Sequence, residues 1–488
     1  MSASAVVFPP SLNSNVYVAY RQRFYILGVF SFLAFNQCAF WLTFSPISPS
    51  TQTYYGIPSA TVDLLLNWGP IIFIPCLPFV YLLLNRKNGL RYTVLILSIA
   101  CFLATFLRII PSLVTSPSSP HFKSISLPFI HAGQIINAAC GPLVMAPVSQ
   151  LSCLWFSPNE RTRATTMAIM ANIFGGTISF LINPAIVSHP SKIPHLLYFH
   201  LGLASLAGLL AIIHFPSQPP TPPSAAGELL MNENSEISSL KAYKDGFIQC
   251  MTNLSFVLLS TAGGVLSGTF AVWTSLFSSI LAPEHYSETQ AGNSFVFFVV
   301  RIRKYISSCV GWFGFAASLA GILGALCLSA LVDRPRFRRS LKLFMLICFI
   351  GCFLSVLCFQ FCVRTVFSDK PLVSSASILI GFSLSFAGLF QGASSPLVYE
   401  SAAEIMFPLP ESLSASILVQ WNNIACVILL FVASQKYKLV NLLVLIVIAV
   451  AILMISFARV TYKRQDEDSR KTAAIAVQSF DLDSQVPE

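Results

Sequence analysis

Polar side chains recur inside the apolar runs of this chain, and they are the residues best able to do chemistry. The run HAGQIINAACGPLVMAPVSQLS places Gln134 and Asn137 about one helical turn apart, a few residues after His131. Amides and indoles in such runs bind polar solutes, or they bond neighbouring helices to one another. The candidates for a solute cavity are Gln37, Trp41, Asn67, Trp68, Gln134, Asn137, Asn172, Trp273, Gln391, Gln420 and Asn423. Their spread over many separate runs favours one shared cavity.

Two titratable residues in these runs are candidates for proton coupling. Asp63 lies near the end of a run, where a desolvated carboxylate can titrate, and His131 titrates in the range of acidic compartments. Asp63 has a second interpretation, as the cap of a helix that begins near Thr61. The indoles of Trp41 and Trp273 attract cations and stack on flat rings. An indole near the end of a run is also typical of a membrane-interface belt.

No catalytic constellation accompanies these residues. The sequence has no P-loop, no Ser-His-Asp arrangement and no metal-ligand spacing, so we predict a protein that is not an enzyme and uses no cofactor or metal. Most of its 13 cysteines lie inside apolar runs, without a CxxC pair. We interpret them as small buried hydrophobes rather than redox or metal groups.

The elements that must position the polar groups are membrane helices. Of the 488 residues, 55% are hydrophobic and only 10% are charged. Each apolar run is close to the roughly 20 residues that a helix needs to cross a bilayer. The runs are continuous rather than alternating, which excludes a transmembrane barrel. The fold class is therefore an all-α polytopic membrane protein. Its net charge of +10 lies in short loops, where it indicates orientation and not nucleic-acid binding.

Twelve transmembrane helices are expected, in two halves of equal number. The predicted spans are 24–45, 61–84, 92–111, 128–154, 165–188, 195–215, 247–281, 312–332, 340–363, 371–398, 413–434 and 438–461. The predicted domains are a cytosolic N-terminus (1–23), a first bundle (24–215), a linker (216–246), a second bundle (247–461) and a cytosolic tail (462–488). The Pro-rich linker is expected to be extended and mobile. Residues 1–20 lack the apolar core of a cleavable signal peptide.

Lys and Arg are concentrated in alternate loops, and this bias predicts that both termini are cytosolic. Arg108 is counted among the few bases of the opposite side. The last cytosolic loop is an exception, because it carries Glu400, Glu404 and Glu411 and no base. Acidic residues contribute little to orientation, so the prediction stands.

Two loops repeat between the halves. NRKNGLR follows the second span and VDRPRFRR follows the eighth, and each places bases around a short turn. Halves with matching loops mark major facilitator transporters, whose substrate site lies near the bilayer midplane between the halves. Asp333 with Arg334 resembles the gating motif of that superfamily, although Asn85 stands where the first copy usually has Asp. The candidates for this cytoplasmic motif are Arg86, Arg91, Glu160, Arg161, Asp333, Arg334, Arg338, Glu400 and Glu404. The alternative for each base alone is topology signalling.

Longer stretches make the resemblance more specific. LLLNWGPIIFIPCLPFVYLLLNRKNGLRYTVL, IHAGQIINAACGP, LWFSPNERTRATT and ASSPLVYESAAEIMFPLPESLSASI resemble solute carrier family 49, the feline leukemia virus subgroup C receptor group of major facilitators. The resemblance runs from Tyr25 to about Arg459 and implies transport of small organic solutes. In this family one member exports pyridoxine from lysosomes with protons, and others carry choline and ethanolamine. Asn172-Ile173 stands where relatives read Asn-Gln, so the choline-type site is not carried over directly.

Three hypotheses follow for the function. The first is a proton-coupled facilitator that moves pyridoxine or a similar small polar or cationic solute. The second is a uniporter for choline or ethanolamine, and the third is a transport-inactive receptor or scaffold. The resemblance, and not a sorting signal in the sequence, implies a lysosomal membrane, with the plasma membrane as the alternative. We expect a monomer in the lipid bilayer, whose partners are its solute and protons.

One segment departs from the family pattern. Relatives pass directly from the loop before the eighth span into AGW, whereas here Asn293–Gly311 separates Gly292 from Trp312. The segment carries the bases Arg301, Arg303 and Lys304. It is too short to cross the membrane twice, and its charges lie on the side where bases are scarce. We interpret it as retained non-coding sequence or an alternative exon, and the alternative is a genuine insertion.

Overall fold

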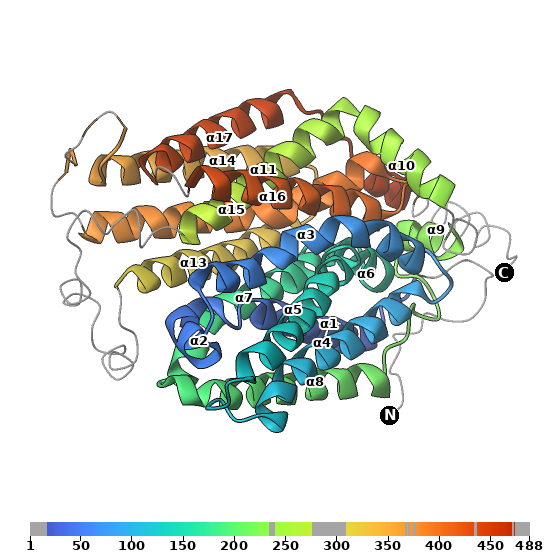
Figure 1. Ribbon diagram of the computed structural model, residues 1–488. Helices are drawn as coiled ribbons and strands as arrows, with labels where there is room; N and C mark the ends of the chain where they lie inside the picture. Colours follow the sequence, from blue (N-terminus) through green and yellow to red (C-terminus); the bar gives the residue numbers. More distant parts are fainter. Residues whose placement is uncertain are drawn as a thin grey trace, which may run out of the picture.

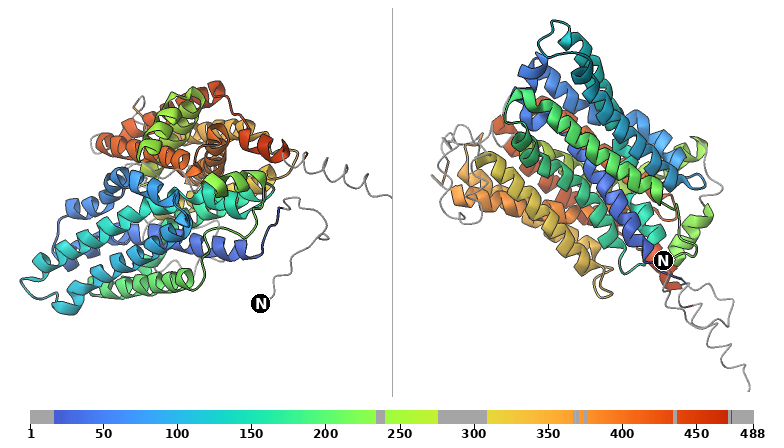
Figure 2. Two further views of the ribbon diagram at one scale, coloured as in Figure 1. Left: turned by 90° about the vertical axis from the view of Figure 1, so that its right-hand side faces the viewer. Right: turned by 90° about the horizontal axis from the view of Figure 1, so that it is seen from below.

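Two bundles of long helices lie side by side in the computed structural model, the first coloured blue to green and the second yellow-green to red (Figures 1 and 2). The structure describes residues 17–233, 240–275, 309–366, 368, 371–373, 377–433, 437–470 and 473. Within these residues, twelve helical segments are long and apolar enough to cross a membrane. The predicted all-α fold class with twelve transmembrane helices is confirmed.

The helices of the first bundle have these bounds: α1 (Gln22–Trp41), α2 (Ser48–Tyr55), α3 (Ser59–Leu84), α4 (Gly89–Val114), α5 (Phe122–Met145), α6 (Val148–Trp155), α7 (Arg161–Ile186) and α8 (Ile193–Ile213). Two short 3-10 turns, η1 (Ser45–Ile47) and η2 (Pro190–Lys192), precede α2 and α8. The predicted fourth span is interrupted between α5 and α6, next to Pro147. Proline has no N–H to donate, so it favours a break there.

The linker contains α9 (Ala225–Glu233) and α10 (Leu240–Thr252), and the second bundle contains α11 (Leu254–Ser275), α13 (Cys309–Val332), α14 (Leu341–Cys362), α15 (Ser377–Met406), α16 (Glu411–Ala433) and α17 (Tyr437–Phe457). A further helical segment, residues 463–470, follows α17, and we call it the tail helix. Most of the predicted insertion Asn293–Gly311 lies outside the described residues, and its last residues open α13.

Two predicted spans have the wrong bounds. The predicted span 247–281 is divided between α10 and α11 at Asn253, whose Oδ1 accepts a hydrogen bond from the backbone N–H of Phe256 (3.1 Å). Asn253 therefore caps the start of a new helix. The predicted span 371–398 instead runs as α15 to Met406. This extension places Glu400 and Glu404 on a helix and not in a loop.

Small residues bring pairs of helices into close contact. A Cβ atom at Gly175 of α7 would lie 2.1 Å from the carbonyl oxygen of Phe35 on α1. A Cβ at Gly388 of α15 would lie 2.1 Å from the carbonyl oxygen of Ala317 on α13. Both distances are far below van der Waals contact, so any side chain would push the backbones apart. Close backbone approach through small residues is the usual way in which membrane helices associate.

Arg108 lies inside the first bundle, which corrects its assignment to an outer loop. The helix α4 continues past it to Val114, and its side chain is fully buried. Its Nη1 donates to the carbonyl oxygen of Phe40 (2.9 Å) and to Thr43 Oγ1 (3.0 Å), at the end of α1. The last carbonyls of a helix have no partner within it and carry partial negative charge. Arg108 therefore caps α1 from a neighbouring helix.

The expected mobile linker is wrong for its first part. Residues 215–233 begin with the buried Phe215, and Ser224 to Gly227 are buried as well. Ser224 Oγ accepts a hydrogen bond from Arg161 Nη2 (2.9 Å), and Pro222 accepts one from the backbone N–H of Val18 (3.1 Å). The Pro-rich composition predicts an extended segment in water. In the structure this segment packs on α6 and is hydrogen-bonded to Arg161 of α7.

Candidate functional site

The first candidate site is a set of amides that joins three helices of the first bundle. Gln37 on α1 and Asn137 on α5 exchange hydrogen bonds, each side-chain nitrogen donating to the other residue's carbonyl oxygen (3.2 Å each). Asn172 on α7 donates to Gln37 Oε1 (3.2 Å) and to the carbonyl oxygen of Ala34 (2.8 Å). All three amides are buried. We call this set, with the residues added below, the amide network.

Two tryptophans extend the amide network to α3. Gln134 Nε2 donates to the carbonyl oxygen of Trp41 (2.9 Å), and Trp41 Nε1 donates to that of Leu66 (2.9 Å). Trp68 Nε1 donates to His131 Nδ1 (3.0 Å), and the two rings are nearly perpendicular (85°) with centroids 6.3 Å apart. The structure therefore brings seven of the predicted residues into one region: Gln37, Trp41, Trp68, His131, Gln134, Asn137 and Asn172. Asn67 is partly buried on the same helix.

Several amide atoms near this level of the bundles lack partners. Gln134 Oε1 and Asn137 Oδ1 are buried without a hydrogen-bond partner in the described part of the chain, and so are Gln420 Oε1 and Asn423 Nδ2 on α16. A buried polar atom left unpaired costs about 1–3 kcal/mol. A polar solute that reached these atoms would recover that free energy.

Trp273 does not belong to this site, which corrects its prediction as a cavity residue. It is fully buried, and its Nε1 donates to Asn441 Oδ1 on α17 (2.9 Å). Its ring meets that of Phe359 on α14 at 90°, with centroids 5.2 Å apart. The indole thus faces the interior of the second bundle, because Asn441 satisfies its N–H there. Gln391, by contrast, bonds α15 to α11 through Ser267 Oγ (3.2 Å).

The cap interpretation of Asp63 is wrong. The helix α3 begins at Ser59 after Pro58, and no side chain caps it. Asp63 therefore lies within the helix, and its side chain is exposed. Its role in proton coupling stays a prediction.

The second candidate site is a charge network where the two bundles meet, at the end of the molecule that carries the tail helix; we call this the closed end. Asp333 follows α13 directly and is buried. Its Oδ1 accepts from the backbone N–H of Thr162 (3.2 Å), and its Oδ2 accepts from the N–H and the Nε of Arg163 (3.0 Å each). Asp333 therefore binds the positive N-terminus of α7 from the other bundle. Burial raises the pKa of Asp333, although these hydrogen bonds lower it.

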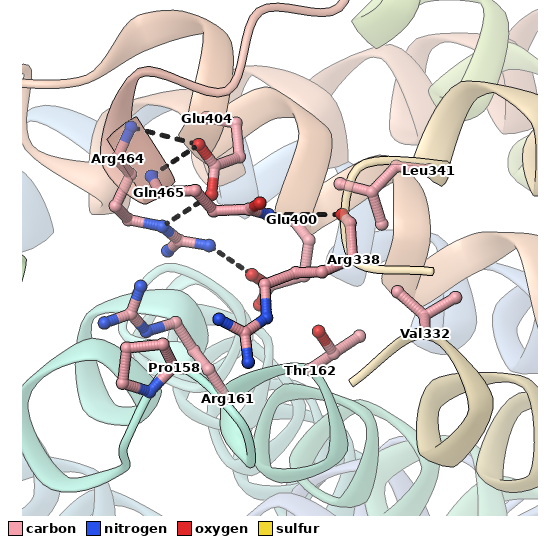
Figure 3. Close-up of a pocket in the computed structure, with 10 residues that line it drawn as sticks. All are labelled: Pro158, Arg161, Thr162, Val332, Arg338, Leu341, Glu400, Glu404, Arg464 and Gln465. Atoms are coloured by element: carbon pink, nitrogen blue, oxygen red, sulfur yellow. Dashed lines mark hydrogen bonds and ion pairs between the residues drawn. The ribbon is translucent and has the colours of Figure 1, made fainter. Parts of the chain in front are cut away.

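Arg464 of the tail helix lies among three acidic residues, which we call the acid triad: Glu400, Glu404 and Glu411. Its Nε donates to Glu404 Oε1 (3.2 Å), its Nη1 to Glu411 Oε1 (2.7 Å) and its Nη2 to Glu400 Oε2. All four side chains are buried, and Figure 3 shows Arg464 reaching toward Glu400 and Glu404. Burial lowers the pKa of Arg464, but the carboxylates raise it by more, so it stays charged. The three acidic residues have no base in their own stretch of sequence, as noted above, and the base that pairs with them, Arg464, comes from the tail helix.

Further contacts cross between the bundles at this end. Thr165 Oγ1 on α7 donates to Glu400 Oε1 on α15 (2.6 Å). Arg161 Nη1 donates to Asp468 Oδ2 of the tail helix (3.3 Å), and Asp468 Oδ1 accepts from the backbone N–H of Ala226 (2.8 Å). The cavity lined by Arg161, Glu400 and Arg464, among others (Figure 3), has room for about one water molecule, ≈ 10 Å³. Ion pairs and hydrogen bonds thus join the two bundles at this end.

The gating candidates from the sequence divide into three groups. Arg161, Asp333, Glu400 and Glu404 lie in the charge network, and Arg338 lines its cavity. Glu160 pairs with Arg23 inside the first bundle (3.1 Å). The side chains of Arg86, Arg91 and Arg334 are exposed and make no ion pair within the described ranges. Sequence reasoning missed Arg163, Arg464 and Asp468. The available signal was the sequence KRQDED after the last span, in which two bases are followed by three acids.

Comparisons with known proteins agree with this architecture. Residues 29–427 match the model of the Major Facilitator Superfamily, and the chain belongs to that superfamily. It is similar to the solute carrier family 49 member 4 homolog of Xenopus tropicalis, with 28% identity over 438 residues, 86% of this chain and 87% of the relative. The predicted resemblance to solute carrier family 49 and to its member 4 is confirmed. The choline/ethanolamine transporter FLVCR1 of Felis catus is 25% identical over 407 residues, 81% of this chain and 64% of the relative.

Solved structures show the same fold. The facilitator FucP in the outward conformation aligns with a TM-score of 0.62 and 11% identity, covering 89% of this chain and 99% of FucP. The proton:xylose symporter XylE, bound to 6-bromo-6-deoxy-D-glucose, aligns with a TM-score of 0.60 and 14% identity, covering 91% of this chain and 98% of XylE. At these identities the likeness concerns the fold alone.

Proposed function

We propose that this chain is a proton-coupled transporter of pyridoxine, a small hydroxylated pyridine, and that it works by alternating access between the two bundles. The observation that carries the proposal is the amide network, which has unpaired oxygen atoms on Gln134 and Asn137 and two indoles on the same side of the first bundle. The contacts that join the bundles at the closed end support it, because alternating access requires that one end close while solute enters from the other.

The chemistry of the amide network favours a solute that donates several hydrogen bonds over a quaternary amine. Hydroxyl groups on a solute could donate to Gln134 Oε1 and Asn137 Oδ1, and a flat ring could stack on Trp41 or Trp68. A quaternary amine uses indole faces through cation–π attraction but has no ammonium N–H to donate. Transport of choline or ethanolamine is the second candidate function, because two relatives are named choline/ethanolamine transporters and the indole rings can bind a cationic amine.

His131 is the proton-coupling residue that we propose. Its Nδ1 accepts the hydrogen bond from Trp68 Nε1, so that nitrogen carries no proton in this state. A proton that binds Nδ1 must break the bond and free the indole N–H. Proton binding on α5 would thereby change what Trp68 presents to a solute. Arg108 on α4, Asp63 on α3 and the tyrosines Tyr54 and Tyr55 on α2 are among the titratable groups on the helices packed against α5, which carries His131.

The charge distribution supports a cytosolic location for both termini and therefore for the closed end. The site would then open toward the lumen or the exterior. Kinship with member 4 supports a lysosomal membrane. Monomeric packing is sufficient for the mechanism, since both bundles belong to one chain.

Uptake assays test the proposal. Cells that display the protein at their surface would receive radiolabelled pyridoxine or choline at about pH 5 and about pH 7.5. We expect pyridoxine uptake that is faster at the lower pH, and we expect His131→Gln to remove the difference. Uptake of choline alone, without pH dependence, would establish the uniporter instead. No uptake of either solute by well-folded protein would favour the receptor or scaffold.

A further inference from the structure

The tail helix contacts both bundles through two residues one helical turn apart. Arg464 lies four residues before Asp468, so the two side chains leave the same face of the helix. Arg464 inserts into the acid triad of α15 and α16, while Asp468 meets Arg161 at the start of α7. A short segment after the last transmembrane helix thereby spans the junction between the bundles.

The contacts of Arg464 belong to one bundle. The acid triad lies on α15 and α16, and the tail helix continues from α17 of the same bundle. If the bundles rotate as rigid bodies, these ion pairs move together and need not break. The carboxylates also keep Arg464 in place, because a buried acid triad without its cation would be strongly unfavourable. Arg464 is therefore an anchor for the tail helix.

The contacts of Asp468 belong to the other side of the junction. Its two oxygens accept from Arg161 Nη1 (3.3 Å) and from the backbone N–H of Ala226 in the linker (2.8 Å). Arg161 in turn donates to Ser224 Oγ of the linker (2.9 Å). These bonds connect the tail helix to α7 and α9, so they must break when the first bundle moves away from the second.

We propose that residues 463–470 are a conformational latch, which Arg464 fixes to the second bundle and which Asp468 closes on Arg161 of the first. The latch rests on the alternating-access mechanism proposed above, but not on the identity of the solute. Its release is a required step in opening the closed end, and a modification or partner that displaced the tail helix would shift the protein toward the open state.

A distance measurement on the full-length protein tests the latch without any solute. Two fluorophores would be introduced through noncanonical amino acids at the exposed positions Lys87, between α3 and α4, and Arg336, between α13 and α14. This labelling avoids the 13 native cysteines. Single-molecule energy transfer in nanodiscs then reports the fractions with the closed end shut and open. We expect Asp468→Asn to raise the open-to-shut ratio about tenfold, because charged hydrogen bonds across the junction are lost.

Matched variants separate the latch from a general charge effect. Arg470→Gln removes an exposed charge from the same helix, where Arg470 pairs only with the neighbouring Glu467 in the described residues. We expect it to leave the ratio unchanged. Exchanging the charges in Arg161→Asp with Asp468→Arg should restore part of the shut fraction that each single change loses. Arg464→Lys, which keeps the charge but not the three-way contact, should give an intermediate ratio.

Two results would overturn the latch. One is an unchanged ratio in Asp468→Asn, and the other is an equal shift in Arg470→Gln. The measurement uses no solute, so it tests the latch separately from the substrate. If the latch behaves as expected but the protein does not take up pyridoxine, only the proposed substrate is refuted. If the protein takes up pyridoxine but Asp468→Asn leaves the ratio unchanged, only the latch is refuted.

Discussion

The helices α7 and α16 begin at equivalent places in the two bundles, but they begin with opposite charges. Arg161 and Arg163 open α7, whereas Glu411 opens α16. Each helix packs against the other bundle, α7 on α13 and α16 on α3. The loop after α13 supplies Asp333 to the basic start of α7, while the matching loop after α3 supplies Asn85, which is buried with both side-chain atoms unpaired among the described residues.

The comparison explains why an Asp follows the span in only one of the two matching loops, Asp333 after α13 and Asn85 after α3. An acid is favourable beside a helix that begins with arginines and a positive N-terminus. It would be unfavourable on the side where Glu411 and the rest of the acid triad are already buried. Instead, Arg464 supplies a cation to that side, and it comes from the tail helix after α17. The charges at the two places are thus balanced differently: by Asp333 at the start of α7, and by Arg464 at the acid triad.

Loss of Arg464 should have the largest effect on this arrangement. We expect Arg464→Gln to lower the free energy of unfolding by about 3–5 kcal/mol, because it leaves three buried carboxylates without a cation. Thermal unfolding of purified protein in detergent checks this, with Arg470→Gln as the control. Arg464→Lys should lose less. A wild-type midpoint for Arg464→Gln would mean that the acid triad is neutral and not ion-paired.

Placing an Asp at position 85, in the loop after α3, should destabilise the protein. We expect Asn85→Asp to destabilise the protein by about 2 kcal/mol at neutral pH, since the new carboxylate would be buried without a hydrogen-bond partner among the described residues, at the end of α3, which packs on α16. The loss should shrink as the pH falls, because a protonated carboxyl carries no charge. The same unfolding assay at a series of pH values measures it, with Asn85→Ala as the uncharged control. A stabilised Asn85→Asp would show that the two junctions close in the same way.

Removing the carboxylate of Asp333, in the loop after α13, should have a smaller effect on closure of the bundles, and that effect should depend on pH. We expect Asp333→Asn to weaken closure by about 1 kcal/mol near neutral pH, because an amide has one acceptor oxygen and cannot accept all the hydrogen bonds that the two Oδ atoms receive from Thr162 and Arg163. Burial raises the pKa of Asp333 in the closed state, despite the bonds from α7. A raised carboxyl pKa means that closure is strongest below the ordinary carboxyl pKa and weakens as the pH rises through the raised value. Asp333→Asn should flatten this dependence, which the energy-transfer pair measures between about pH 4 and pH 8.

The exposed bases in the loop after α3, Arg86 and Arg91, should contribute least to stability. We expect Arg86→Gln and Arg91→Gln to change the unfolding free energy by no more than about 0.5 kcal/mol, because both side chains are exposed and unpaired in the described chain. Arg163→Gln, which removes a half-exposed ion pair with Asp333, should cost about 1 kcal/mol at most. If Arg86→Gln costs more than Arg163→Gln, the first copy is a working gate and the asymmetry argued above is wrong.

The amide network was largely predictable from the sequence, whereas the tryptophans were predictable only in part. Gln37, Gln134, Asn137 and Asn172 are costly in lipid, so their presence in apolar runs indicates bonds within a bundle. Trp41 and Trp273 lie in the first span of each half and look alike in the sequence. In the structure they differ, because the indole N–H of Trp273 donates to Asn441 on α17 and that of Trp41 donates to the backbone of α3. Such a choice depends on helices that are distant in the chain.

The sequence by itself determined the twelve helices, the two halves and the residues that the membrane makes expensive. Hydropathy and helix length are local properties, and each run of about 20 apolar residues decides its own span. Only the tertiary structure decided that Arg464 pairs with Glu400, Glu404 and Glu411, and that Asp468 meets Arg161. The partners in these pairs lie on different helices or in different halves of the chain. Burial and opposite charge bring them together, and neither can be read from spacing along the sequence.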